Sequence, residues 1–168
     1  MKNIVLIGIM GCGKTTVGEQ LGNDLNWPFL DVDSRIEREY GPIPDLFIKG
    51  EDCFRVAEAQ VISECASLHG HVISTGGGVV LRESNMLLLK QNGILFFIDR
   101  PIDHIASSID ASRRPLLRNG TNILYDLYEK RLPLYLSYAD YHILASGDVQ
   151  FSVDRIKEIL NNNGLLSL

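Results

Sequence analysis

The sequence predicts an α/β fold in which a five-stranded parallel sheet is flanked by helices on both faces. Short runs that are apolar throughout alternate with longer segments whose apolar residues recur at helical spacing. Strands that are apolar on both sides are typical of a parallel sheet buried between two layers of helices. A chain of 168 residues suits one domain, and we expect residues 1–168 to form it.

The expected strands are the short apolar runs. They cover residues 3–7, 28–32, 72–74, 94–98 and 142–144. A glycine-rich stretch follows the first run, and Val17, Leu21 and Leu25 then continue at helical spacing. Ligands of parallel sheets bind beyond the carboxyl ends of the strands. That edge should therefore collect residues 8–15, 31–33, 74–78 and 99–100.

The expected helices fill the intervals between the strands. One begins near Ser34, because Ser34 and Glu37 have the spacing of a capping box. Residues 41–50 form a broken region between two helical patterns. Longer helical patterns cover residues 52–68, 122–138 and 152–160.

The composition argues against several classes of protein. Sixteen basic and 21 acidic residues give a net charge of −5, so the chain lacks the basic field typical of a nucleic-acid binder. Its longest uncharged run is too short to cross a bilayer, and we expect no signal peptide ahead of the first strand. Cys12, Cys53 and Cys65 are odd in number and lack CxxC spacing, which favours reduced thiols. We expect a cytoplasmic protein with neither a membrane nor a nucleic-acid partner.

Residues 8–15 read GIMGCGKT and fit the phosphate-binding pattern GxxxxGK[ST] between a strand and a helix. The glycines let backbone N–H groups converge on phosphate oxygens, and the helix N-terminus adds its positive end. A glycine-rich turn that happens to precede a lysine is the alternative, which the strand–loop–helix context disfavours. We expect ATP contacts from Gly11, Cys12, Gly13, Lys14, Thr15 and Thr16. Lys14 would reach the β- and γ-phosphates, and the Thr15 hydroxyl would bind Mg²⁺.

Two carboxylates end the second expected strand. Strand alternation places Asp31 and Asp33 on the same side, where one can face a metal and the other an acceptor substrate. Asp33 could instead cap the helix that begins near Ser34.

Three glycines at residues 76–78 directly follow a strand, and we expect them to let a ligand touch bare backbone rather than to form a flexible turn. Arg55 has Glu51 and Glu58 at helical spacing. The spacing alone favours a solvated ion-pair face over a ligand contact.

The order of these motifs resembles the shikimate kinase family, which consists of small P-loop kinases. The resemblance runs from Ile4 to about Leu160, and it rests on residues 8–15, 30–37, 50–58, 74–78, 114–117 and 131–135. It implies a P-loop kinase fold with a mobile lid near residues 110–120 and substrate-binding helices near residues 34–60. It also implies Mg²⁺-dependent transfer of the γ-phosphoryl group of ATP to the 3-hydroxyl group of shikimate, in aromatic amino-acid biosynthesis.

The resemblance further implies roles for single residues. Shikimate contacts would come from Asp33, Arg55, Gly76, Gly77, Gly78 and Arg131. Thr15 and Asp31 would hold Mg²⁺, while Lys14, Asp33 and Arg114 would serve catalysis, with Arg114 touching the ATP phosphates from the lid. Guanidinium forks suit the carboxylate of shikimate, and carboxylate acceptors with backbone donors suit its hydroxyl groups. Asp33 could accept the proton of the attacking hydroxyl or only orient it.

The chain also departs from the family pattern. Residues 41–54 form a slightly shorter segment, in which Phe47 is the candidate for an aromatic contact with the substrate. Residues 106–109 lack the arginine that stacks on adenine in the family.

The second arginine of the expected acceptor site lies in a predicted helix. Pro133 should bend or end a turn of that helix and so bring Arg131 opposite Arg55. Alternatively, Arg131 is a solvated residue that pairs with Glu129 or Asp126. Other small-molecule kinases and non-catalytic nucleotide switches share the phosphate loop, but they do not predict the remaining motifs together. We expect a monomer.

Overall fold

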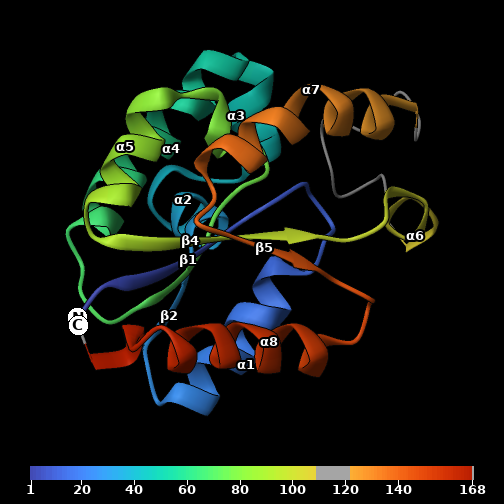
Figure 1. The fold of residues 1–168 in the computed structure, drawn as a ribbon. Coiled ribbons are helices and arrows are strands. Elements are labelled where there is room, and N and C mark those ends of the chain that lie inside the picture. The colour runs from blue at the N-terminus through green and yellow to red at the C-terminus, as the bar shows by residue number, and fades with distance from the viewer. Residues whose placement is uncertain (109–121, 168) are drawn as a thin grey trace.

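Five parallel strands form the sheet at the centre of the computed structural model, which describes residues 1–108 and 122–167 (Figure 1). Their order across the sheet is β2-β3-β1-β4-β5. The strands are β1 (Asn3–Ile7), β2 (Phe29–Asp31), β3 (Val72–Ser74), β4 (Gly93–Asp99) and β5 (Tyr141–Leu144). Helices cover both faces, which confirms the predicted fold class.

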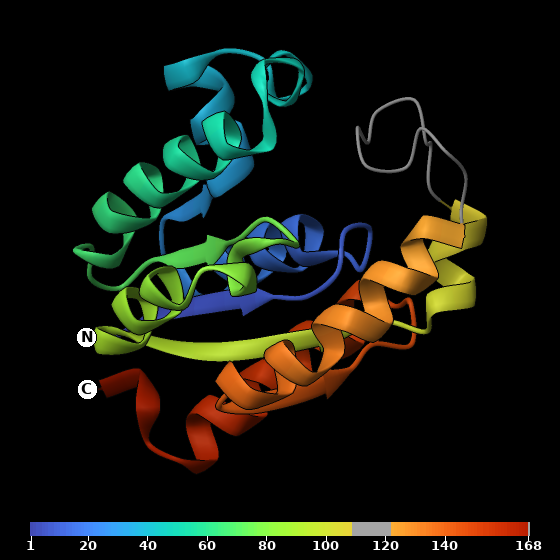
Figure 2. The same cartoon turned by 90° about the horizontal axis from the view of Figure 1, so that it is seen from above.

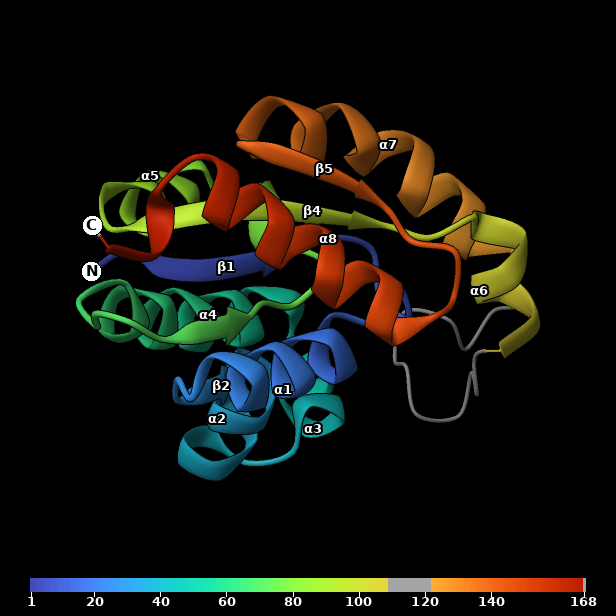
Figure 3. The same cartoon turned by 60° about the horizontal axis from the view of Figure 1, so that its bottom comes forward.

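The helices form one layer on each face of the sheet. They are α1 (Lys14–Leu25), α2 (Val32–Tyr40), α3 (Ile43–Lys49), α4 (Glu51–Ala66), α5 (Glu83–Gln91), α6 (Ile102–Ser108), α7 (Asn122–Tyr138) and α8 (Val149–Asn162), with short 3₁₀ turns η1 (Val79–Leu81) and η4 (Leu165–Ser167). Helices α1 and α8 cover one face, as Figure 3 shows. Helices α4, α5 and α7 cover the other, with α4 and α7 toward opposite edges of the sheet (Figure 2).

The central strand β1 sets the position of the phosphate loop. Every residue of β1 is buried, because β3 and β4 flank it and helices cover both of its sides. Ile4 is in register with Val72 of β3 and with Ile94 of β4. The carboxyl ends of these strands therefore lie side by side, and the loops that follow them meet at one edge of the sheet.

The start of α2 differs from the prediction. The helix begins at Val32, and its N-cap is Asp31, whose Oδ1 accepts a hydrogen bond from Ser34 N at 2.9 Å. The predicted capping box is wrong, because Glu37 Oε1 accepts from Ile43 N at 3.2 Å instead of turning back onto its own helix. Strand β2 ends at Asp31, so Asp33 lies in the first turn of α2 and strand alternation does not relate the two carboxylates.

Two further differences concern helices. The region at residues 41–50, expected to be broken, contains α3, and α5 was not predicted. Helix α7 has the predicted bounds and continues through Pro133 to Tyr138, so the proline does not end it. The expected lid and Arg114 lie outside the described residues. No helix within residues 1–108 or 122–167 is long and apolar enough to span a membrane.

Candidate active site

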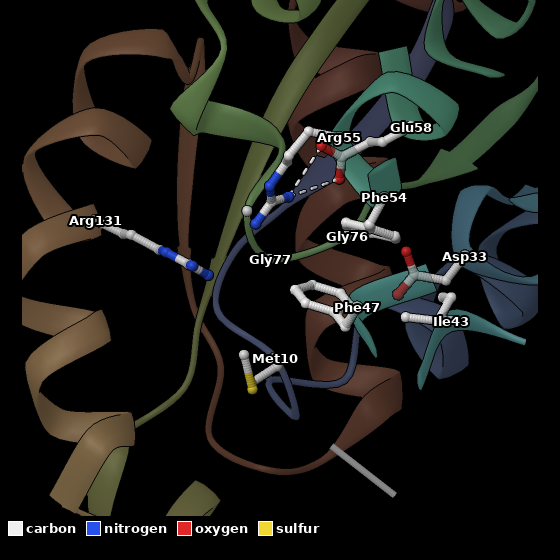
Figure 4. A pocket seen from close by; sticks show the side chains of 11 residues that line it. Met10, Asp33, Ile43, Phe47, Phe54, Arg55, Glu58, Gly76, Gly77 and Arg131 are labelled. Carbon is white, nitrogen blue, oxygen red and sulfur yellow. Dashed lines mark hydrogen bonds and ion pairs between the residues drawn. The ribbon is translucent and has the colours of Figure 1, made fainter. Parts of the chain in front are cut away.

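Two neighbouring cavities lie at the carboxyl edge of the sheet. The P-loop cavity is lined by Met10, Gly11, Gly13, Lys14, Thr15, Thr16, Asp31, Asp33, Thr75, Gly76, Gly77, Arg100 and Ser108. The arginine cavity is lined by Met10, Asp33, Ile43, Phe47, Phe54, Arg55, Glu58, Gly76, Gly77, Gly78 and Arg131 (Figure 4). Four residues line both cavities, namely Met10, Asp33, Gly76 and Gly77. The structure thus brings the predicted loops together at the predicted edge.

The phosphate loop joins β1 to α1. Gly13, the N-cap of α1, has a φ of 99°, a left-handed conformation that a residue with a side chain adopts only at a cost. Lys14 is buried, and its Nζ donates to Gly8 O at 2.8 Å and to Ile9 O at 3.0 Å. Cys12 fills the space beside this ammonium group, with Sγ 3.6 Å from Nζ. The loop therefore holds its one cation in place through its own carbonyl groups.

An oxygen pair lies at the rim of the P-loop cavity. Thr15 Oγ1 donates to Asp31 Oδ2 at 2.7 Å, while the other oxygen of Asp31 caps α2. A hydroxyl and a carboxylate are hard oxygen ligands of the kind that Mg²⁺ takes beside phosphates. The described residues include no cluster of three or more metal-binding side chains. These two residues therefore fit an ion that a nucleotide and water coordinate as well.

Arg55 forms the predicted ion pairs and also faces the arginine cavity. Its Nη1 lies 3.0 Å from Glu58 Oε1, and its Nη2 lies 3.2 Å from Glu51 Oε1. The Arg55 side chain is only 13% exposed, so the expectation of a solvated face is wrong. Burial raises the pKa of Glu58, and the nearby Arg55 and Arg131 oppose this rise. A Cβ on Gly78 would overlap the Arg55 guanidinium, so a side chain there would have to displace the end of Arg55.

Arg131 reaches the arginine cavity from α7, and in the view of Figure 4 it lies across the cavity from Asp33 and Ile43. It is 3% exposed, and its buried Nη1 has no hydrogen-bond partner. No ion pair joins it to Glu129 or Asp126, so the alternative of a solvated helix residue is wrong. The two arginines differ in that Arg55 has carboxylate partners and Arg131 has none within the described residues.

Of the three glycines after β3, Gly76 and Gly77 line both cavities and Gly78 lines the arginine cavity. A Cβ on Gly76 would come within 2.8 Å of Asp33 Oδ1, and one on Gly77 within 3.0 Å of Met10 N in the phosphate loop. Gly77 O accepts a hydrogen bond from Tyr135 Oη at 2.5 Å. Tyr135 is fully buried, and this burial raises the pKa of its hydroxyl group. Helix α7 thereby holds the glycine loop as well as contributing Arg131.

Aromatic rings form part of the floor of the arginine cavity. Phe47 of α3 stacks on Phe54 of α4, with ring centroids 4.7 Å apart, and both line the cavity. Phe47, the candidate for an aromatic contact with the substrate, thus lines the arginine cavity. The Arg55 guanidinium carbon lies 5.0 Å from the centre of the Phe54 ring.

Several lining residues had no binding role predicted from the sequence, although Met10, Thr75 and Arg100 were expected at this edge of the sheet. They are Met10, Ile43, Phe54, Glu58, Thr75, Arg100 and Ser108. Ile43 could be found only with α3, which was not predicted. Arg100 had a signal, because it follows a buried strand at the edge where ligands of parallel sheets bind.

This chain is similar in sequence and in fold to known proteins. A sequence model of the shikimate kinase family matches residues 10–161. A shikimate kinase of Clostridium botulinum (strain Alaska E43 / Type E3) is 42% identical over 165 residues, which span 97% of this chain and 100% of the relative. The structure of a shikimate kinase from Acinetobacter baumannii in complex with shikimate is 37% identical, with a TM-score of 0.94, and the match covers 98% of this chain and 96% of that chain. The shikimate kinase structure from Aquifex aeolicus is 36% identical, with a TM-score of 0.84 and coverage of 97% and 98%.

Proposed function

The chain belongs to the shikimate kinase family, and we propose that it transfers the γ-phosphoryl group of ATP to the 3-hydroxyl group of shikimate. The product would be shikimate 3-phosphate, an intermediate of aromatic amino-acid biosynthesis. The observation that carries this proposal is the junction of the two cavities at Met10, Asp33, Gly76 and Gly77. A phosphate bound by the phosphate loop and a hydroxyl group held in the arginine cavity would meet there.

The donor side of the proposed reaction is the P-loop cavity. We assign ATP contacts to Gly11, Cys12, Gly13, Lys14, Thr15 and Thr16. Backbone N–H groups at the start of α1 suit phosphate oxygens, and the Lys14 ammonium supplies positive charge where the phosphoryl group transfers. Phosphoryl transfer depends mainly on such alignment and charge neutralisation.

Thr15 and Asp31 would hold Mg²⁺. The 2.7 Å contact between their oxygens places a hydroxyl and a carboxylate together, and both are ligands suited to this ion. When bound, Mg²⁺ would neutralise negative charge on the phosphates. The chain itself contributes the position of both oxygens, because Asp31 is also fixed as the cap of α2.

The acceptor side is the arginine cavity. Arg55 and Arg131 would bind the carboxylate of shikimate, since planar guanidinium groups fit carboxylates. Gly76, Gly77 and Gly78 would approach the ring with bare backbone. Asp33 lines both cavities, so its carboxylate is the group that would orient the attacking hydroxyl or accept its proton.

We also propose a role for Arg114, an oligomeric state and a location in the cell. Arg114, on a lid at residues 110–120, would touch the ATP phosphates, as family membership implies. A monomer is proposed because one chain lines both cavities. A cytoplasmic location is proposed because Cys12, Cys53 and Cys65 are free thiols.

An ADP-release assay over a panel of acceptors tests the function. Shikimate, gluconate, other hydroxy acids and nucleoside monophosphates are compared at equal concentration, with a Lys14→Ala variant as the inactive control. We expect ADP release to depend on shikimate and to fall about a hundredfold or more in the variant. Turnover with another acceptor, and none with shikimate, would reject the proposal.

A further inference from the structure

Arg100 carries a buried nitrogen that nothing in the described structure satisfies. It directly follows Asp99, the last residue of β4. Its Nε atom is buried and has no hydrogen-bond partner. Within the described residues, the other arginine with such an atom is Arg131, which faces the arginine cavity. A buried N–H group without an acceptor costs free energy, so a ligand that accepts from it would be favoured.

Arg100 lies where the P-loop cavity meets a third cavity. We call the latter the β5 cavity, because it lies between the start of α1 and residues 145–149, which follow β5. Gly13, Thr16 and Arg100 line both cavities, and Arg100 is the one charged residue among them. A Cβ on Gly147 would be 3.9 Å from Arg100 Nη2, so the guanidinium reaches across toward this loop.

The carboxylates near Arg100 are engaged elsewhere. Asp99 accepts hydrogen bonds from Tyr128 Oη at 2.9 Å and pairs with His142 Nε2 at 2.9 Å. Asp148, which lines the β5 cavity, caps α8 by accepting from Gln150 N at 3.0 Å. Neither forms an ion pair with Arg100, so among the residues that the structure describes no salt bridge explains why this arginine lies at the junction.

We propose that Arg100 binds the α-phosphate of the nucleotide. The inference rests on the proposed use of ATP but not on the identity of the acceptor. Lys14 marks the end of the P-loop cavity where the terminal phosphates belong. A nucleotide that continues past Thr16 into the β5 cavity must pass from phosphates to nucleoside beside Arg100. The α-phosphate stands at that transition, and a guanidinium fork matches its oxygens.

Calorimetric titration with Mg²⁺ and ADP tests the inference without any acceptor. We expect Arg100→Ala to weaken ADP binding by about ten- to a hundredfold, the range for a hydrogen bond to a charged group. Arg100→Lys should lose less, because it keeps the charge and loses the fork. Arg155→Ala is the matched control, since Arg155 is an exposed arginine of α8 that pairs with Glu158 and lines none of the three cavities.

Inorganic tripolyphosphate separates a phosphate contact from a contact with the nucleoside. Its inhibition constant against ATP should rise in Arg100→Ala by a factor similar to that for ADP. Unchanged ADP binding in Arg100→Ala would overturn the inference. Weaker ADP binding with unchanged inhibition by tripolyphosphate would also overturn it, because the contact would then be to the base or ribose. Wild-type affinity in Arg100→Lys would contradict a forked contact.

Two further measurements separate this inference from a structural role and from the proposed function. The melting temperature of Arg100→Ala without nucleotide should not fall below that of the wild type, because the substitution removes an unsatisfied buried group. A clear fall would favour a structural role and count against the inference. If the wild type fails to phosphorylate shikimate while Arg100→Ala still weakens ADP binding, the proposed function fails and the inference stands.

Discussion

The two arginines that line the arginine cavity differ in the partners of their guanidinium groups. Arg55 shares its guanidinium with Glu51 and Glu58, whereas Arg131 has a buried nitrogen without a partner. The Nη1 atom of Arg131 can therefore donate to a ligand, while Arg55 is already oriented by its carboxylates. A ligand carboxylate would therefore contact Arg55, which its own carboxylate partners hold in place, and Arg131, which has a donor without an acceptor.

Removing the Arg131 side chain should therefore weaken the binding of shikimate and not that of ATP. We expect Arg131→Ala to weaken shikimate binding by about ten- to a hundredfold, while the affinity for an ATP analogue changes by less than about twofold. Arg131→Lys should recover part of the loss, because it keeps the charge without the fork. Calorimetric titration of each variant with each ligand measures both effects. An alanine variant with wild-type shikimate affinity would exclude Arg131 from the acceptor site.

We expect the stability of the folded protein to depend on pH through the Glu58 carboxyl group. Burial raises its pKa in the folded protein above the ordinary value. A carboxyl group with a raised pKa contributes stability below its unfolded pKa, and this contribution is lost as the pH rises through the folded pKa. We expect the wild type to lose stability relative to Glu58→Gln as the pH rises from the acid range toward neutrality. Urea unfolding of both proteins at several pH values checks the sign, and a constant difference between them would contradict it.

At the scale of elements, α7 contributes to the cavity through more than its arginine. Tyr135, one helical turn beyond Arg131, donates to Gly77 O and packs on Phe97 with ring centroids 5.0 Å apart. The hydrogen bond fixes the peptide plane that begins at Gly77. Tyr128 of the same helix donates instead to Asp99, which lines neither the P-loop cavity nor the arginine cavity. Tyr135 and Tyr128 thus both donate a hydrogen bond from α7, but only Tyr135 donates to a residue that lines the two cavities.

These two tyrosines allow a matched test. Tyr135→Phe should raise the KM for shikimate by roughly three- to tenfold and reduce stability by about 1–3 kcal/mol, because Gly77 O loses its buried donor. Tyr128→Phe should leave the KM for shikimate near the wild-type value. Steady-state kinetics and urea unfolding measure the two quantities. Equal KM values in both variants would show that the bond to Gly77 does not position the glycine loop.

The helices and strands also show how much of the structure sequence patterns can predict. The strands were predictable because each is a short apolar run, and α7 because its apolar residues recur at helical spacing. Helix α2 started earlier than predicted because the Asp31 carboxylate caps it, and a capping residue within a strand pattern gives no periodic signal. The buried state of Arg131 depends on how α7 packs on the sheet, which spacing along the chain does not encode. The phosphate loop was predictable because one contiguous segment performs its role.

At the scale of the whole molecule, the glycine loop couples two binding cavities. A Cβ on Gly77 would press on the backbone of the phosphate loop at Met10 N, whereas a Cβ on Gly76 would press on the side chains of Asp33 and Glu58. The backbone cannot turn away as a side chain can. Substitutions of Gly76 and Gly77 should therefore affect the KM values for different substrates.

We expect Gly77→Ala to raise the KM values for both ATP and shikimate, because it displaces the phosphate loop. Gly76→Ala should raise mainly the KM for shikimate. Each increase should be about threefold or more, since a tight contact in a packed interior commonly costs 1–3 kcal/mol. Steady-state kinetics with each substrate varied in turn measures the pattern. A Gly77→Ala variant with an unchanged KM for ATP would show that the two cavities respond independently.

The four residues common to both cavities have a consequence for inhibitor design. The cavities meet at Met10, Asp33, Gly76 and Gly77, and two of these are glycines without side chains. A single compound that joins a nucleotide to a cyclic hydroxy acid through a short phosphate linker would therefore occupy both cavities at once. Its second half would bind at the high effective concentration that a short linker imposes. Such a bisubstrate compound would make the contacts of both substrates, while only one molecule would lose translational and rotational entropy on binding.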